Sequence, residues 1–128
     1  KTILELLLKE GEKSKEWLIF GTTGQAAESL TYYLPQFHLK RIEKKIMFKA
    51  IYSKDSLERA KEIKKLKLTD VRLLSKEYIT PTHISIVGDK TGIILWSEDI
   101  LGILIESKEI AESFRSYFNL LWKISKKI

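Results

Sequence analysis

Residues 81–99, PTHISIVGDKTGIILWSED, contain one of only two histidines in the chain, and His83 is the side chain best suited to chemistry. An imidazole can act as a nucleophile or as a general acid and base near neutral pH. His83 falls in an apolar, strand-like run just before a turn, which is also typical of a half-buried, hydrogen-bonded histidine. Three interpretations stay open: a nucleophile, the remnant of one, or a structural side chain.

The composition excludes several other kinds of site. The chain has no cysteine, so it has no disulfide, no thiolate nucleophile and no cysteine zinc site. With only two histidines we expect neither a metal nor a cofactor. The 128 residues, 44% of them hydrophobic, can bury one core and are too few for two ordinary domains. Since no apolar run spans a membrane and no signal-peptide pattern is present, we expect a cytoplasmic protein.

The spacing around His83 resembles the motif of phospholipase D-type phosphodiesterases. In that family a His attacks phosphorus, a Lys two residues later neutralises the phosphate, and an Asp five residues further on stabilises the imidazolium. Here Ser85 stands at the lysine position and Lys90 at the aspartate position, with Asp89 one place early. The Gly-Ser-x-Asn patch that follows in the family falls on Trp96, Ser97, Glu98 and Asp99.

The missing lysine argues against catalysis. Phosphoryl transfer depends on positioning and on neutralising charge, so a serine at this position removes on the order of several kcal/mol of transition-state stabilisation. We therefore expect no catalytic residue and no enzyme. His83 would then be structural, or would line a pocket that binds without reacting. The degenerate motif comprises His83, Ser85, Asp89, Ser97 and Asp99.

A pocket is expected where parallel strands of an α/β sheet end, because ligands bind outside the carboxyl ends of such strands. The turn after the first strand offers backbone amides at a helix N-terminus, which suits an anion, although such turns also arise for steric reasons. His38 and Arg41 lie one helical turn apart, either as a phosphate-facing pair or on a solvated edge. The ligand-binding candidates are Gly21, Thr22, Thr23, Gly24, Gln25, His38, Arg41, Tyr52 and His83.

Hydrophobic periodicity in the first 75 residues predicts alternating helices and strands. A leucine-rich helix ends before Gly11, Pro35 separates two helices, and Asp55 with Glu58 has capping-box spacing. The predicted helices are 2–10, 25–33, 37–45 and 56–67. The predicted strands are 17–20, 47–53 and 71–75.

The second half predicts a different arrangement. The runs HISIVGD, TGIILWS and LGILIES read as an antiparallel meander. Ser107 then caps a long helix, whose predicted apolar face includes Ile110, Phe114, Phe118 and Leu121. Residues 1–128 are thus expected to form a single α/β domain, a mixed sheet with packed helices in the order α-β-α-α-β-α-β-β-β-β-α.

The formal net charge of +6 is concentrated in residues 38–67, which hold eleven Lys or Arg against four Asp or Glu. This stretch could attract phosphate backbones or an acidic partner. It is equally typical of a solvated, lysine-rich pair of outer helices. The basic patch is defined by Lys40, Lys44, Lys45, Lys61, Lys64 and Lys65.

From about Leu4 to Lys126, the sequence resembles the region after the winged-helix domain in archaeal TrmB-family transcriptional regulators. The residues that carry the resemblance are WLIFGTTGQAAESL, FHLKRIEKKIMFKAIYS and, most specifically, GDKTGIILWSEDILGILIESKEIAESFRSYFNLLWKISK. Members of this family carry a phospholipase D-like domain without its catalytic residues. The resemblance therefore agrees with the degenerate motif around His83.

The resemblance implies a regulatory sensor and homodimerisation domain that could bind a small anionic effector. DNA would be read by an absent N-terminal winged helix, of which residues 1–12 would be the end of the connecting helix. The dimer interface would lie on the N-terminal helix, the C-terminal helix or the strand edge near His83. Two alternatives remain: a phosphodiesterase or nuclease, and a basic nucleic-acid-binding module.

Overall fold

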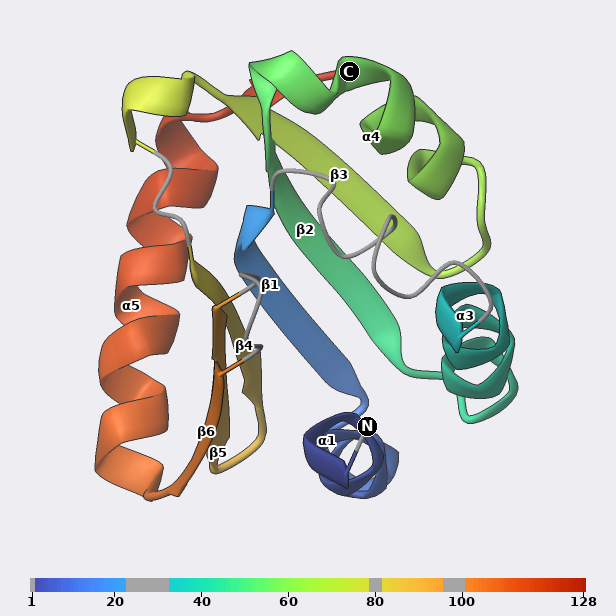
Figure 1. Ribbon diagram of the computed structural model, residues 1–128, viewed down its shortest axis with the longest axis vertical. Helices are drawn as coiled ribbons and strands as arrows, with labels where there is room; N and C mark the ends of the chain where they lie inside the picture. The colour runs from blue at the N-terminus through green and yellow to red at the C-terminus, as the bar shows by residue number, and fades with distance from the viewer. Residues whose placement is uncertain (1, 23–32, 79–81, 96–100) are drawn as a thin grey trace.

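In a computed structural model of the protein, which describes residues 2–22, 33–78, 82–95 and 101–128, helices pack on both faces of a mixed sheet (Figure 1). The helices are α1 (Thr2–Ser14), α3 (Tyr33–Glu43), α4 (Leu57–Lys64) and α5 (Lys108–Ile124), with 3₁₀ turns η1 (Lys54–Ser56) and η2 (Lys76–Tyr78). The strands are β1 (Glu16–Thr22), β2 (Met47–Ser53), β3 (Thr69–Leu74), β4 (Thr82–Val87), β5 (Lys90–Leu95), β6 (Leu101–Glu106) and β7 (Lys126–Lys127).

The strand order β6-β5-β4-β1-β2-β3-β7 divides the sheet at β1. On one side β1, β2 and β3 are parallel. On the other, β4 runs antiparallel to β1 and begins the meander β4-β5-β6. The predicted α/β class and the antiparallel meander are therefore confirmed. Most of the helix predicted at 25–33 lies outside the described residues.

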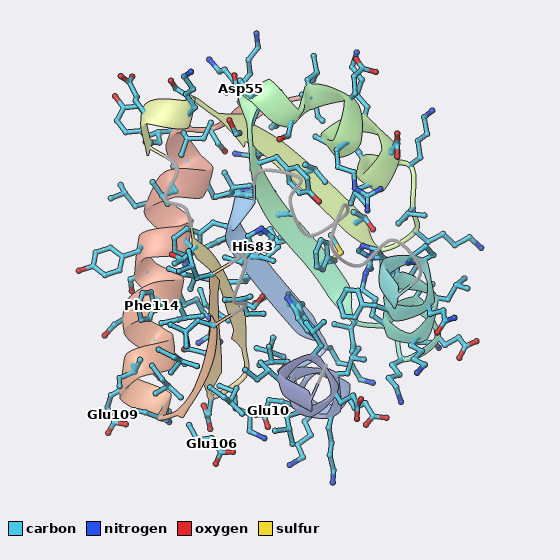
Figure 2. All side chains as sticks on the ribbon, viewed as in Figure 1. Glu10, Asp55, His83, Glu106, Glu109 and Phe114 are labelled. Atoms are coloured by element: carbon cyan, nitrogen blue, oxygen red, sulfur yellow. The ribbon has the colours of Figure 1, made fainter. Side chains whose placement is uncertain are left out.

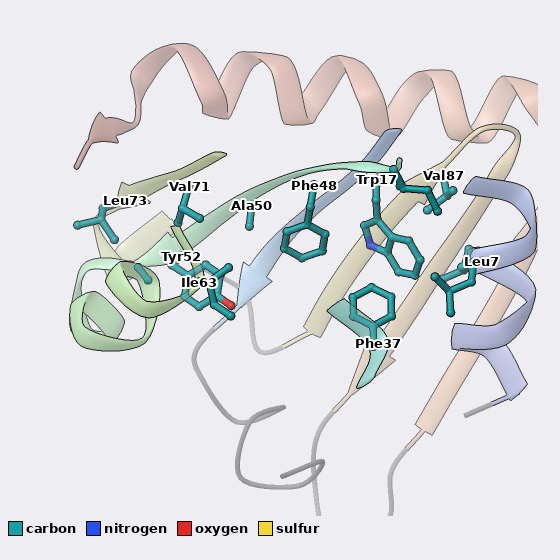
Figure 3. Packing of buried hydrophobic residues seen from close by; sticks show 13 residues of the cluster. Leu7, Trp17, Phe37, Phe48, Ala50, Tyr52, Ile63, Val71, Leu73 and Val87 are labelled. Carbon is teal, nitrogen blue, oxygen red and sulfur yellow. The ribbon is translucent and has the colours of Figure 1, made fainter. Parts of the chain in front are cut away.

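Each face of the sheet has its own hydrophobic core, because successive side chains along a strand point to opposite faces. Trp17 of β1 faces α1, α3 and α4, whereas its neighbour Leu18 faces α5. Trp17 lies in the larger core, beside Phe37 and Phe48 (Figure 3). The α5 core is smaller, with Phe118 fully buried.

Helix α1 does not end before Gly11, as the glycine suggested, but continues to Ser14. Gly11 is buried, and a β-carbon there would lie 2.8 Å from Cδ1 of Ile46. The glycine therefore permits a close approach of α1 to the chain before β2. The helix ends instead at Ser14, and Lys15 follows it with a left-handed φ of 61°.

The predicted capping box of α4 and the predicted start of α3 are wrong, although α4 begins within one residue of its predicted start at 56. Asp55 lies in η1, where its backbone N–H donates to Oγ of Ser53 at 3.2 Å. Ser56 precedes α4 without a side-chain cap, so there is no capping box. Helix α3 begins at Tyr33 and includes Pro35, because a proline in the first turn has no intrahelical hydrogen bond to lose.

The predicted cap of α5 is confirmed, since Oγ of Ser107 accepts a hydrogen bond from the N–H of Ile110 at 3.2 Å. The predicted apolar face is right for Phe118, which is buried, and for Phe114 and Leu121, which pack against this core. It is wrong for Ile110, which is 38% exposed. Ala111 is fully buried instead. The buried stripe is therefore rotated from the predicted face toward Ala111 and Trp122, because the sheet contacts only part of a wide apolar arc on this helix.

Truncation of Phe118 tests the smaller core. The Phe118→Ala variant should lower the free energy of unfolding by about 3–5 kcal/mol, because the ring is fully buried and stacks on Trp122. Urea denaturation measures the change. Leu39→Ala on the exposed side of α3 is the control and should change stability by about 0.5 kcal/mol or less. Equal effects of the two substitutions would contradict this packing.

Candidate functional site

His83 lies on β4 with its side chain on the same face of the sheet as Ser85 and Val87, toward the larger core. It is 6% exposed and pairs with Ile94 of β5 in the strand register. Its other neighbour is the end of β1, where a β-bulge falls between Ile19 and Thr22. His83 therefore lies at the carboxyl end of β1, between the parallel and antiparallel halves of the sheet, as expected for a site residue.

Ser85, which stands where a phosphodiesterase has its lysine, has a structural role. Nε1 of Trp17 donates a hydrogen bond to Oγ of Ser85 at 3.1 Å, and both side chains are buried. The indole packs edge-on against Phe37, with ring centroids 4.9 Å apart. A lysine at position 85 would place its ammonium group among these aromatic rings and leave the indole N–H without this acceptor, and both changes are costly.

Asp89 and Lys90 lie at the opposite end of β4 from His83. The strand from His83 to Val87 spans roughly 13 Å at the usual rise per residue. Asp89 is exposed in the turn, and Nζ of Lys90 lies 3.6 Å from Glu10 and 3.7 Å from Glu106. Figure 2 shows these two glutamates at the end of the meander remote from His83.

Within one chain, then, Asp89 and Lys90 are too far away to support the imidazole of His83. Ser97 and Asp99 of the degenerate motif lie outside the described residues. Burial lowers the pKa of His83 to about 4. The ring is therefore neutral near neutral pH.

His38 and Arg41 do share a face of α3, but that face is buried rather than solvated. Nε of Arg41 donates to Nδ1 of His38 at 3.0 Å, so the neutral imidazole carries its proton on Nε2. Burial, followed by the charges of Arg41 and Arg59, lowers the pKa of His38 to about 3. The imidazole is therefore an acceptor for Arg41 and not a cation.

The guanidinium of Arg41 is fully buried and holds three segments together. Its Nη1 donates to the carbonyl oxygens of Ile46 at 3.2 Å and Leu68 at 2.8 Å, and its Nη2 donates to Oγ1 of Thr69. Burial lowers its pKa to about 10, so the group remains charged at neutral pH. An anionic ligand would have to replace these protein groups as the hydrogen-bond acceptors of Arg41.

The strand ends hold the remaining ligand-binding candidates. Gly21 is buried at the bulge with a φ of 84°, a conformation that favours glycine. Tyr52 is 8% exposed and belongs to the larger core. Thr22 ends β1, and Thr23, Gly24 and Gln25 lie outside the described residues. Anion binding at this turn therefore stays a prediction.

Two cavities lie near these residues. A groove of about 380 Å³ between α3 and α4 is mainly apolar and is lined by Pro35, His38, Leu39, Ile42, Arg59, Glu62, Ile63 and Leu66. A smaller cavity of about 260 Å³ lies at the carboxyl end of β3. It is lined by Lys54, Leu73, Leu74, Ser75, Tyr78, Ile124 and Lys126. Sequence periodicity did not indicate either one, because both depend on how separate elements pack.

The basic patch lies on α3, α4 and the turns that follow them. Lys44 forms an ion pair with Glu12 at 2.7 Å, Lys61 lies 4.0 Å from Glu58, and Nζ of Lys64 donates to the carbonyl oxygen of Ile128. Lys40, Lys45 and Lys65 are exposed, and none of them forms an ion pair with a carboxylate among the described residues.

The described residues form neither a cluster of metal ligands nor a membrane-spanning helix. No three His, Asp or Glu side chains there are grouped closely enough to hold a metal ion. None of the described helices is both long and apolar enough to cross a membrane.

Comparison with solved structures identifies the fold. The chain superposes on TrmBL2, an archaeal chromatin protein whose structure shows a novel mode of DNA binding, with a TM-score of 0.68 and 17% identity. The match covers 100% of this chain and 51% of TrmBL2, so the chain spans about half of that protein. NucT from Helicobacter pylori matches with a TM-score of 0.68 and 14% identity, over 99% of this chain and 91% of NucT.

These likenesses confirm a TrmB-like fold. No protein-family model matches the sequence, and no curated protein matches it.

The two buried histidines predict that stability depends on pH. Both are neutral when folded, with pKa values of about 3 and 4, whereas the unfolded chain binds a proton at each below about pH 6.5. The free energy of unfolding should therefore be highest above pH 6.5 and fall as the pH is lowered. Between pH 7 and 5 the loss should be roughly 2 kcal/mol for each histidine.

Urea denaturation at several pH values measures this loss. Replacing His83 with Gln should remove about half of the slope, and replacing His38 as well should remove most of it. A free energy of unfolding that stays constant from pH 7 to pH 5 in the wild type would contradict the burial of both imidazoles.

Proposed function

We propose that this chain is a non-catalytic regulatory domain of a TrmB-like DNA-binding protein and that it acts as a homodimer. The observation that carries the proposal is the hydrogen bond from Trp17 to Ser85. Ser85, which the resemblance aligns with the phosphate-neutralising lysine, uses its hydroxyl oxygen for a hydrogen bond within the core. A phosphodiesterase site without that positive charge lacks the main stabilisation of its transition state.

The arrangement around His83 further supports a non-catalytic role. A nucleophilic imidazole needs access to substrate and a group that stabilises the cation formed when it reacts. His83 is buried, and Asp89 of the degenerate motif lies at the other end of β4. The fold is shared with both TrmBL2 and NucT, so the residues of the site, and not the fold, support this choice.

The proposal predicts no phosphodiesterase activity that depends on His83. Purified wild type and His83→Ala should hydrolyse bis(p-nitrophenyl) phosphate at the same rate, equal to the rate in buffer. Equal but faster hydrolysis by both proteins would indicate a contaminating enzyme. Hydrolysis by the wild type that is lost in His83→Ala, with the circular dichroism spectrum unchanged, would overturn the non-catalytic assignment.

A second candidate function is contact with DNA through the basic patch. It is favoured by the exposed and unpaired state of Lys40, Lys45 and Lys65 among the described residues. They lie on α3, α4 and the turns just beyond these helices. Lysines of this kind contact phosphates without reading the base sequence.

Salt dependence tests this contact. The affinity of the chain for duplex DNA should fall steeply as the salt concentration rises. In a plot of the logarithm of the binding constant against the logarithm of the salt concentration, each phosphate contact should contribute about 0.9 to the downward slope. Replacing Lys40, Lys45 and Lys65 together with Gln should reduce that slope. The control replaces Lys13, Lys108 and Lys123, which are also exposed, and alters net charge equally. The same slope in both triple variants would show that the basic patch is not the contact surface.

A further inference from the structure

Helix α5 has an apolar arc about twice as wide as the sheet can cover. At 100° per residue, the side that packs on the sheet comprises Ala111, Phe114, Phe118, Leu121 and Trp122. A second flank lies next to it, and none of the charged residues of α5 (Lys108–Ile124) falls on that flank. That flank comprises Ile110, Ser113, Tyr117, Leu120 and Ile124, all of which are exposed. The charged residues of the helix lie elsewhere on its circumference.

This flank lies beside the edge strand β6. Only Ser107 separates β6 from α5, so the first turns of the helix run back along the strand (Figure 1). Leu104 packs toward α1. Because successive side chains along a strand point to opposite faces of the sheet, Leu101 and Ile103 lie on the face that α5 covers. Both are exposed, by 58% and 47%.

Together the strand and the helix form one exposed apolar surface, the α5–β6 patch. It comprises Leu101, Ile103, Ile110, Tyr117, Leu120 and Ile124, six of the eleven exposed large apolar side chains of the described residues. If each of these residues has an accessible surface of roughly 200 Å² when fully exposed, their exposed fractions correspond to a total accessible surface of roughly 600 Å². A patch of this size is at the upper limit for a monomeric protein.

The size of the patch fits a second copy of the chain. Two such surfaces in contact would bury about 1,200 Å² in total, the lower end of the range for stable interfaces. The patch adjoins a strand that has a neighbour on only one side within the described sheet, so backbone groups can add hydrogen bonds across a two-fold axis. Antiparallel pairing of β6 with itself would also keep Glu106 away from its own counterpart.

We propose that two copies of this chain associate through the α5–β6 patch, with the edge strands β6 antiparallel across the two-fold axis. This assignment rests on the homodimer in the proposed function and specifies the surface that forms it. The interface is isologous, because each copy contributes the same strand and the same helix flank.

Sedimentation through the micromolar range tests the assignment. The wild type should be a dimer, and Leu120→Lys should weaken dimerisation by about tenfold or more, because the change places a charge inside an apolar interface. Leu39→Lys is the matched control, since Leu39 is an exposed helical leucine outside the patch. It should leave the dimer intact, and circular dichroism should show that both variants are folded.

The absence of cysteine from the chain permits a second readout. Ile103→Cys should form a disulfide-linked dimer on mild oxidation, and Leu39→Cys should not. A wild-type dimer that survives Leu120→Lys and resists linking at position 103 would overturn the α5–β6 assignment and leave the homodimer standing. A wild-type monomer would overturn both, whereas the hydrolysis assay tests the non-catalytic role separately.

Discussion

The position of Trp17 constrains much of the structure. Its indole lies in the larger core against Phe37, and its N–H needs an acceptor because burial removes it from water. Ser85 supplies that acceptor from the neighbouring strand β4. The hydrogen bond joins the first strand of the chain to the meander and fixes which side chain stands two residues after His83. At this position the packing of the core therefore requires a small hydrogen-bond acceptor and disfavours the lysine of a phosphodiesterase motif.

Arg41 acts in a comparable way at the other side of the larger core. It is a fully buried cation, which is stable only if its donors are satisfied. The carbonyl oxygens that accept its hydrogen bonds come from the segments before β2 and β3. Leu68 adopts a left-handed φ of 52° there, so the guanidinium stabilises a turn that the local sequence does not favour. Both polar groups that suggested a ligand site on α3 are thus used within the protein.

Periodicity predicted the elements well where one side of a helix or strand is buried. The meander was evident from three apolar runs, and Ser107 was recognisable as a cap. Gly11 was misread because a glycine looks the same in sequence whether it ends a helix or admits a neighbour such as Ile46. Asp55 was misread because the chain makes a 3₁₀ turn capped by Ser53 before α4 begins.

The sequence predicted where the candidate site residues lie better than it predicted their burial and their hydrogen-bond partners. The place of His83 within a strand follows from local pattern, although it lies at the start of β4 and not just before the turn. The burial of His38 and Arg41 does not, because it depends on α4 and β3, which are distant in sequence. Likewise, spacing alone could not show that Ser85 serves Trp17, 68 residues away along the chain.

The position of α1 affects the order in which the chain can fold. Gly92 and Gly102 lie where a β-carbon would touch Ile3 and Leu7 of α1 or come close to them, so the first helix packs against strands made from the last third of the sequence. During synthesis the apolar face of α1 cannot pack against these strands until β5 and β6 have left the ribosome. The parallel half of the sheet, by contrast, is complete by Leu74. Helix α1 therefore precedes the other described elements in the sequence but is among the last of them to reach its place, and its leucines remain open to other partners until then.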